Sequence, residues 1–314
     1  LLFATNLFAR DQIKIVGSST VYPFATTVAE RFGKTSGFKT PVVESTGSGG
    51  GLKLFCAGLG TQHPDITNAS RRIKQTEIDN CKKNGIKDIT EVKIGYDGIA
   101  IANSKKGVNF HLSTRDLYLA LAKDVPADIN GKTVKPNPYK RWIEINPTYP
   151  DLPIVVYGPP PTSGTRDALN ELGIERGCKT YPERKKLKES NKKLYKSECR
   201  AIRTDGAYIE AGENDNLIIE KLTTNPDSLG IFGYSFLDEN RDKVKPATIN
   251  GVSPEFELIS NGTYPISRSL WFYVKDVHAT VIPGIKEYVK EFTSERAIGD
   301  DGYLIQKGLI PLND

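Results

Sequence analysis

The sequence predicts an α/β fold, because short apolar strand patterns alternate with amphipathic helix patterns along most of the chain. At 314 residues, of which 38% are hydrophobic, the chain is long enough for two domains and apolar enough to bury a full core. No run of about 18 consecutive apolar residues is present, so we expect no helix that spans a membrane.

The first half of the chain contains three strand-and-helix pairs. Residues 12–17 (QIKIVG) predict a strand, and residues 21–36 (VYPFATTVAERFGKTS) predict a helix with Pro23 in its first turn. Residues 40–45 predict a second strand, which leads through TGSGGG into a helix over 52–58. The remaining predicted elements here are a strand end at 65–70, a helix at 76–85 closed by Gly85, and a long strand at 92–104.

The second half continues the alternation. Its predicted elements are a strand at 151–158, a helix at 165–177, extended segments at 229–237 and 266–275, and an amphipathic helix at 282–298. Trp142, in the polar stretch KRWIEIN, is expected to be half exposed. Because we find no low-complexity linker and no internal repeat, we expect two lobes that are interwoven by crossing strands.

Three strand-to-helix junctions share the same chemistry. IKIVG is followed by SST, VVES by TGSGGG, and IVVYG by PPPTSGT, and each is followed by a helix pattern. Ser and Thr are common helix caps, so one such junction alone would indicate capping. Three of them, one with a triple glycine and one with Ser-Gly-Thr, point to backbone N–H groups at helix N-termini that bind an anion. The phosphate-loop pattern G-x-x-x-x-G-K-[ST] is absent, so we expect a small oxyanion and not a nucleotide.

At these residues the chain resembles the substrate-binding protein of the bacterial high-affinity phosphate ABC importer. The motifs that carry the resemblance are IVGSSTVYPF, ESTGSGGGLKLFCAG, DITNASRRI, TSGTRDAL, LGIFGYSFL, YPISRSLWFYVK and DDGYLIQKGLIPL. The resemblance implies a type II periplasmic-binding-protein fold, with two α/β lobes joined by a hinge of crossing strands and phosphate held in the cleft. It places residues 11–101 plus 265–314 in one lobe and residues 102–264 in the other.

The resemblance also implies the ligand-binding residues. Carried over position by position, they are Ser19, Thr20 and Val21 in the first loop, Ser48 and Gly49 in the second, Ser70 and Arg71 after the third strand, and Ser163, Gly164 and Thr165 in the second lobe. No cofactor and no metal are expected.

Two positions depart from the family pattern. Better-known members carry an Asp that accepts the proton of hydrogen phosphate where this chain has Arg71, and an Arg where it has Pro159. Arg166, directly after Thr165, replaces the second of these. Arginine offers a planar fork of donors suited to bidentate contact with an oxyanion, so we expect both arginines to contact the ligand.

Because this chain lacks the family's Asp at position 71, another residue has to accept the proton of hydrogen phosphate. A buried carboxylate admits only an anion that still carries a proton, which is how such a site rejects sulfate. We expect Asp205, in RTDGAYIE, to take this role, with Asp97 in GYDGIA as the reserve. The alternative for Asp205 is that it forms a turn before Gly206.

The N-terminus and the cysteines indicate export. LLFATNLFA resembles the end of a signal peptide cleaved near Ala9, so residues 1–10 are a signal-peptide remnant or an N-terminal tail. Sequence order suggests the disulfides Cys56–Cys81 and Cys178–Cys199, although four cysteines permit three connectivities. A zinc site is the competing interpretation, but C-x-x-C spacing is absent and the three histidines stand apart. We therefore expect a periplasmic protein of the Gram-negative type.

The net charge of +5 comes from one segment. Residues 176–200 carry ten Lys or Arg against three Glu, a local +7, which leaves 5 − 7 = −2 for the rest of the chain. With only two tyrosines among them, these charges do not indicate nucleic-acid binding. They predict solvated helix faces or a surface that attracts anions or an acidic partner.

Together these features predict a binding protein and not an enzyme. No histidine lies near the hydroxyl-rich loops in the sequence, and the nucleophile pattern G-x-S-x-G is missing. The expected partners are inorganic phosphate and the permease of an ABC transporter, and the expected state is a monomer. The alternatives are sulfate, molybdate or a phosphonate in the same role, and a structural or adhesive secreted protein that binds no such ligand.

Overall fold

The computed structural model describes residues 10–161, 163–212 and 215–312. The chain forms two compact units: unit 1 consists of Leu1–Tyr96 and Ser269–Asp314, and unit 2 of Asp97–Arg268. The predicted lobes divide after residues 101 and 264, which is a few residues away from the divisions after Tyr96 and Arg268. The predicted signal-peptide cleavage near Ala9 lies outside the described residues. None of the described helices is long and apolar enough to cross a membrane.

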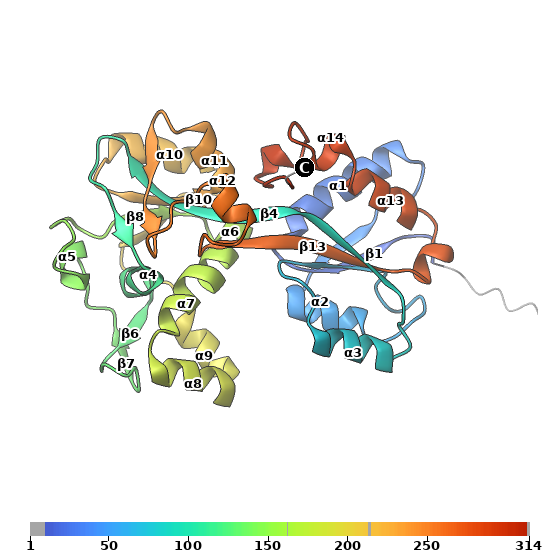
Figure 1. Ribbon diagram of the computed structural model, residues 1–314, viewed down its shortest axis with the longest axis horizontal. Coiled ribbons are helices and arrows are strands. Elements are labelled where there is room, and N and C mark those ends of the chain that lie inside the picture. Colours follow the sequence, from blue (N-terminus) through green and yellow to red (C-terminus); the bar gives the residue numbers. More distant parts are fainter. Residues whose placement is uncertain (1–9, 162, 213–214, 313–314) are drawn as a thin grey trace, which may run out of the picture. The chain divides into compact units, whose positions relative to one another are not determined.

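Unit 1 is built on a sheet of mixed direction (Figure 1). Strands β1 (Lys14–Gly17), β2 (Val42–Ser45) and β3 (Ile66–Ala69) are parallel, and β13 (Ser267–Lys275) pairs antiparallel with β3. The sheet order is β2-β1-β3-β13-β4, where β4 spans Ile89–Ser104. Both β4 and β13 have residues in both units, so the crossing strands of the expected fold are present.

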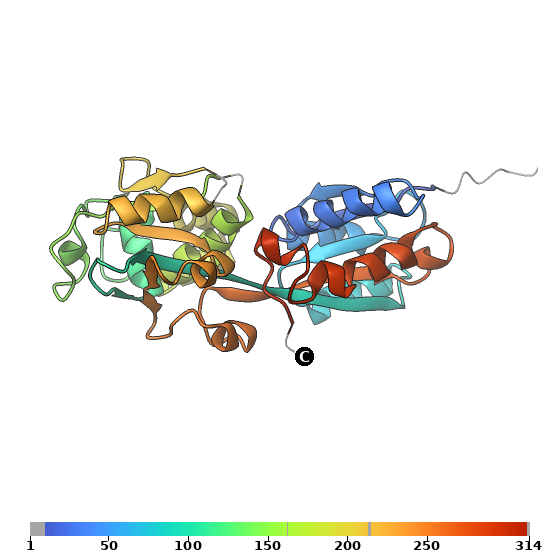
Figure 2. The same cartoon turned by 90° about the horizontal axis from the view of Figure 1, so that it is seen from above.

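Helices cover both faces of this sheet (Figures 1 and 2). One face packs against α1 (Tyr22–Thr35) and α13 (Ile285–Phe292), and the other against α2 (Ser48–Phe55) and α3 (Gln75–Lys83). The alternation of β13 explains the two cores, because successive strand residues point to opposite faces. Leu270, Phe272 and Val274 join the α1 and α13 core, whereas Tyr273 joins the α2 and α3 core. The short helical segments that complete unit 1 are η2 (His278–Thr280), α14 (Glu295–Ile298) and η3 (Ile305–Lys307).

Unit 2 has its own sheet in the order β4-β10-β8-β9, with β11 (Val244–Pro246) paired to β4. Strands β8 (Val156–Gly158), β9 (Tyr208–Glu210) and β10 (Leu229–Gly233) are parallel to one another. The smaller strands of this unit pair as β5 (His111–Leu112) with β12 (Thr248–Ile249) and β6 (Asp124–Pro126) with β7 (Val134–Pro136).

The helices of unit 2 include one long continuous run. It begins as α6 (Gly164–Ala168), widens into the π-helical turn η1 (Leu169–Ile174) and ends as α7 (Glu175–Cys178). The other helices are α4 (Thr114–Leu121), α5 (Trp142–Ile145), α8 (Pro182–Ser190), α9 (Lys192–Cys199), α10 (Asp215–Thr224), α11 (Tyr234–Glu239) and α12 (Phe256–Ser260).

Three local expectations are wrong. Helix α2 begins at Ser48, inside the glycine run, and not at residue 52. The extended segment predicted over 229–237 ends at Gly233, after which the chain turns into α11. Trp142 is fully buried and not half exposed. The centre of its ring lies 5.4 Å from that of the Phe110 ring and 6.4 Å from that of the Tyr149 ring, so both rings pack against it.

Both expected disulfides are confirmed. Cys56 pairs with Cys81 between α2 and α3, and Cys178 pairs with Cys199 between the ends of α7 and α9. All four cysteines are fully buried. Among the described residues, no cluster of three or more His, Cys, Asp or Glu side chains could hold a metal ion.

Candidate functional site

The predicted site residues of unit 1 gather at one edge of its sheet. The carboxyl ends of parallel strands meet at the same edge, and the register places Gly17 beside both Ser45 and Asn68. Two backbone hydrogen bonds tie the loops that follow: Ser18 N–H donates to Asn68 O at 2.9 Å and Thr46 N–H to Gly17 O at 2.8 Å. The loops before α1, before α2 and after β3 therefore lie together.

The loop before α1 presents the start of a long helix at this edge. Val21 is fully buried at the N-cap, and its N–H approaches Ser18 Oγ at 3.4 Å. Thr20 is also buried, whereas Ser19 is half-buried. With Pro23 in the first turn and no acidic residue there, the positive end of the helix dipole is not compensated by a local carboxylate.

Ser48 and Ser70 are brought together by the packing of α2 against β3. Ser48 Oγ accepts a hydrogen bond from the Ser70 N–H at 3.0 Å and lies 3.1 Å from Ser70 Oγ. Ser48 is the first residue of α2, so its hydroxyl stands where the first amides of that helix have no partner within the helix. Two hydroxyls and a helix N-terminus thus share one small region.

The glycines of TGSGGG have different roles. Gly47 needs to be glycine for its backbone angle, with φ at 72°. Gly51 needs to be glycine for space, because a Cβ there would lie 2.4 Å from Gly17 Cα and 2.7 Å from Thr67 Oγ1. A Cβ on Gly49 would meet no other atom within 4 Å. Gly49 is therefore a glycine for which the rest of the chain supplies no packing reason, and a Cβ there would border open space.

Arg71 is anchored to a neighbouring carboxylate. Its guanidinium donates to both oxygens of Glu77, at 2.9 and 2.7 Å, and to Arg72 O at 3.1 Å. Burial works to raise the pKa of Glu77, but the hydrogen bonds from Arg71 and from the Lys74 backbone hold this pKa below its ordinary value. Glu77 thus remains ionised and fixes the Arg71 side chain at the start of α3, a bond that the sequence analysis missed.

Four of the predicted residues of unit 2, Ser163, Gly164, Thr165 and Arg166, lie where α6 begins. The end of β8 leads into Pro159, and Ser163 caps the helix by accepting a hydrogen bond from the Thr165 N–H at 3.2 Å. Gly164 is the first residue of this helix, which continues through η1 to the end of α7. The Ser-Gly-Thr sequence therefore forms the N-terminus of a continuous helical run, as its position after a strand predicts.

Arg166 is buried in the first turn of that helix. The residue is 8% exposed, and its guanidinium lies 4.4 Å from the centre of the Tyr208 ring. One guanidinium nitrogen donates to Pro159 O at 3.0 Å, and Tyr208 Oη donates to the same carbonyl at 2.7 Å. Burial raises the pKa of Tyr208 to about 12, so its hydroxyl keeps its proton. These contacts hold a cation beside the positive end of a helix.

Among the described residues, the carboxylate within ion-pair distance of Arg166 is that of Glu210 and not that of Asp205. Glu210 ends β9 in register with Gly158 of β8, and its Oε1 lies 3.8 Å from the Arg166 guanidinium. Its side chain is half exposed. Glu210 is not among the predicted site residues, because the sequence pattern does not indicate the short strand β9. A polar residue at the carboxyl end of a parallel strand is the signal that would have indicated it.

Asp205 has other partners. It accepts two hydrogen bonds from Arg203, at 2.7 and 2.6 Å, and one from Lys140 at 2.7 Å. The hydrogen bonds from Arg203, with Lys140 adding to them, hold the pKa of this carboxyl far below its usual range. Among the described residues, Asp205 makes no hydrogen bond or ion pair with Ser163, Thr165 or Arg166. The reserve candidate, Asp97, is partly buried and paired with Arg268 at 3.2 Å.

The chain is similar to known proteins over most of its length. A family described as the PBP superfamily domain matches residues 4–296. Protein SphX of Synechococcus elongatus is 32% identical over 266 residues, which cover 83% of this chain and 67% of that protein. A protein named phosphate-binding protein PstS, from Staphylococcus saprophyticus, is 28% identical over 285 residues, covering 89% of this chain and 75% of that protein.

Two solved structures share the fold. A possible phosphate binding protein from Planctomyces limnophilus has a TM-score of 0.73 and 26% identity, and the match covers 96% of this chain and 93% of that one. PstS from Borrelia burgdorferi has a TM-score of 0.60 and 20% identity, and the match covers 97% of this chain and 100% of that one, which is a likeness of fold. The expected α/β fold with crossing strands is thereby confirmed.

Proposed function

We propose that this chain, which belongs to the PBP superfamily, binds inorganic phosphate and delivers it to the permease of an ABC importer. The relative from Staphylococcus saprophyticus that matches over most of its length is named for phosphate binding, and so is the solved structure from Planctomyces limnophilus. Both names agree with the chemistry of the loops, which offer hydrogen-bond donors and positive charge at helix N-termini.

The observation that carries this proposal is the position of Arg166. A buried arginine normally needs a close carboxylate, and a helix N-terminus favours negative and not positive charge. Arg166 sits in the first turn of α6, nearly buried, and among the residues that the structure describes its closest carboxylate oxygen lies 3.8 Å away. Two sources of positive potential are therefore placed side by side. An oxyanion bound at Ser163–Thr165 relieves both at once.

Unit 1 carries donors of the same kind at its own sheet edge. The hydroxyls of Ser48 and Ser70, the start of α1 at Ser19–Val21 and the open backbone at Gly49 replace part of the water that phosphate loses on binding. Arg71 adds positive charge at the same sheet edge while it stays fixed by Glu77. Binding is the whole reaction, and we propose no covalent step and no cofactor.

The finer features follow from this role. We propose that the protein acts outside the cytoplasmic membrane, in the periplasm of a Gram-negative-type cell, where the disulfides Cys56–Cys81 and Cys178–Cys199 persist. We propose that it works as a monomer whose partner is the permease.

The test is a calorimetric titration of ligand-stripped protein with phosphate and with sulfate, at about pH 5 and about pH 8. We expect micromolar or tighter binding of phosphate and none of sulfate. Arg166→Gln should weaken phosphate binding at least about 100-fold, because a charge-assisted bidentate contact is lost in a dry site. Arg141→Gln is the matched control, since it removes the same charge from an exposed ion pair with Asp151 in the same unit.

The proton acceptor is tested with the same titration. Asp205→Asn addresses the acceptor expected from the sequence, and Glu210→Gln addresses the carboxylate nearest to Arg166. The variant that begins to bind sulfate identifies the residue that enforces selectivity. Comparable binding of sulfate by the unmodified protein would assign it to another oxyanion, and binding of neither anion would reject the proposal.

A further inference from the structure

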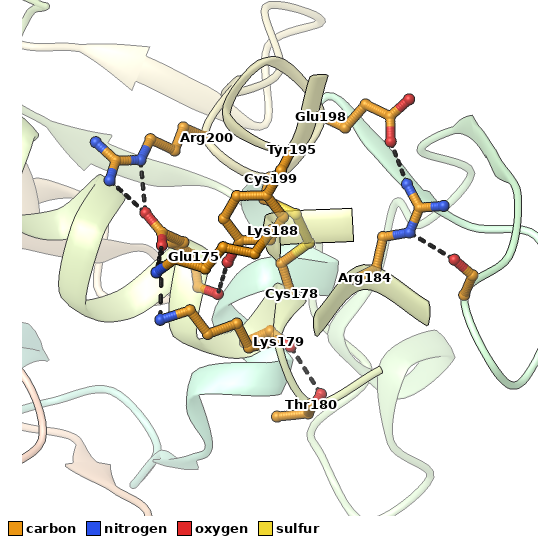
Figure 3. The surroundings of a disulfide bond; sticks show 12 residues. Glu175, Cys178, Lys179, Thr180, Arg184, Lys188, Tyr195, Glu198, Cys199 and Arg200 are labelled. Atoms are coloured by element: carbon orange, nitrogen blue, oxygen red, sulfur yellow. Dashed lines mark hydrogen bonds and ion pairs between the residues drawn. A yellow bond between two sulfur atoms is a disulfide. The ribbon is translucent and has the colours of Figure 1, made fainter. Parts of the chain in front are cut away.

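The basic segment folds into a rigid pair of helices. We call α8 and α9 together the basic hairpin; the disulfide Cys178–Cys199 ties its far end back to α7 (Figure 3). Arg184 of α8 pairs with Glu198 of α9 and donates to Gly131 O at 2.5 Å and to Lys132 O at 2.7 Å. The hairpin is therefore held in one conformation by a covalent bond and by buried polar contacts.

Glu175 forms the second anchor, to the left of the disulfide in Figure 3. This residue is 3% exposed and accepts from Lys188 at 2.8 Å and from Arg200 at 2.6 Å, with Lys179 at 3.6 Å. Burial works to raise the pKa of Glu175, but the hydrogen bond from Lys188 and the charge of Arg200 keep this pKa below its ordinary value. These cations serve the fold itself.

Four lysines of the hairpin serve no such purpose. Within the described part of the chain, no acidic side chain lies within ion-pair distance of Lys185, Lys192, Lys193 or Lys196, and all four are exposed. The arginines, by contrast, are all used internally: Arg184 and Arg200 in ion pairs, and Arg176 in a hydrogen bond to Pro265 O. The exposed positive charge without an ion pair is thus lysine, and Glu189 of α8 is an exposed carboxylate that also has no ion pair within the described part of the chain.

Three of these lysines stand at positions where their charge is electrostatically unfavourable for their own helix. Lys192 and Lys193 form the first turn of α9, which has no acidic residue there, so both face the positive end of the helix dipole. Lys196 is four residues after Lys192 and three after Lys193, spacings at which like charges repel on a helix surface. Leu194, which follows Lys193 in the sequence, has 42% of its surface exposed. Within the described part of the chain, no ion pair of these lysines compensates for the unfavourable charge interactions.

We propose that the basic hairpin binds the surface of an anionic lipid bilayer, with Lys185, Lys192, Lys193 and Lys196 contacting headgroups and Leu194 touching the acyl boundary. In a cluster of four or more lysines near an anionic membrane, each lysine contributes about 1 kcal/mol to the attraction. A protein partner is less suited to this surface, because protein interfaces are depleted in lysine and enriched in arginine and aromatic residues. The single exposed aliphatic side chain between lysines fits an interfacial helix.

The experiment is co-sedimentation of the full chain with vesicles in phosphate-free buffer. One set of vesicles contains about one-third phosphatidylglycerol in phosphatidylcholine, and the other contains phosphatidylcholine alone. We expect binding to the anionic vesicles only, weakened by salt. Replacing the four lysines by glutamine should reduce the partition coefficient at least about 100-fold, and Leu194→Gln should reduce it less.

The control separates the hairpin from net charge. Replacing Lys82, Lys83, Lys105 and Lys106 by glutamine removes four exposed charges from other parts of the surface and should leave binding nearly unchanged. Equal losses in both variants, or no binding to anionic vesicles, would overturn the proposal. Binding to immobilised polyglutamate without binding to vesicles would also overturn it, in favour of an acidic protein. The vesicle result is independent of the phosphate titration.

Discussion

Asp97 and Arg268, the first and last residues of unit 2, are joined by an ion pair of 3.2 Å between Oδ2 and Nε. Asp97 belongs to β4 and Arg268 to β13, so the bond links the two strands at the points where the chain enters and leaves this unit. Arg268 also contacts Glu171 at 3.0 Å. Burial raises the pKa of Asp97 although Arg268 works to lower it, so desolvation outweighs the attraction.

The two partners should therefore respond differently to substitution. Arg268→Met leaves the Asp97 carboxylate buried without its cation, and we expect the free energy of unfolding to fall by about 3 kcal/mol. Asp97→Asn keeps a hydrogen-bond acceptor and removes a charge that burial already disfavours, so we expect a change within about 1 kcal/mol. Urea unfolding at neutral pH measures both. The double variant should be more stable than Arg268→Met alone, and equal losses for the two single variants would contradict this account.

Because of Lys275, we expect the free energy of unfolding to rise at alkaline pH. It is fully buried and donates to Gly58 O at 2.7 Å, and burial lowers its pKa to about 8, against a favourable contribution from Asp65. The unfolded chain holds this proton up to about pH 10.4, so between these values the folded state binds fewer protons and stability rises with pH. Other groups titrate in the same range, so the measured quantity is the difference from Lys275→Met.

We expect this difference in free energy of unfolding to increase by about 2 kcal/mol in favour of the unmodified protein between about pH 7 and about pH 10. Lys286→Met, which removes an exposed lysine, is the control and should show no such trend. A constant difference across this range would mean that Lys275 keeps its proton in the folded protein.

The sequence predicted the fold and the loops better than it predicted individual partners. Periodicity and the Ser, Thr and Gly junctions located the strand ends, because these patterns depend on nearby residues. Asp205 stood beside Gly206 with no sign of Lys140, which is far away in the sequence and supplies one of its ion pairs. Trp142 has polar neighbours, and its burial depends on Phe110 and Tyr149, which only the tertiary structure brings to it.

Ser48 is expected to affect binding more than stability. Ser48→Ala removes the acceptor of the Ser70 N–H and one of two hydroxyls 3.1 Å apart at the sheet edge. Because the proposed anion draws on that hydroxyl, we expect phosphate affinity to fall about 10-fold or more, with a loss of unfolding free energy of about 1 kcal/mol. Calorimetry and urea unfolding separate the two effects. Ser36→Ala, which removes a half-buried hydroxyl that donates to Phe32 O, should leave phosphate affinity unchanged.

The glycine run offers the sharpest comparison, because Gly49 and Gly51 lie in the same helix two residues apart. Gly51→Ala places a Cβ 2.4 Å from Gly17 Cα, where backbone has to move, and we expect a loss of about 3 kcal/mol or more in unfolding free energy. Gly49→Ala meets no other atom within 4 Å and suits a helix, so we expect stability to be equal or higher by up to about 1 kcal/mol.

Phosphate affinity is expected to be sensitive to alanine at position 49, where stability is not. The methyl group of Gly49→Ala occupies the open space where the backbone meets the proposed anion, so we expect weaker phosphate binding by a protein that is fully stable. Urea unfolding and calorimetry on the same preparation test both halves of the prediction. If Gly49→Ala bound phosphate as tightly as the unmodified protein, the anion would not approach this part of the backbone, and Gly49 would leave the proposed site.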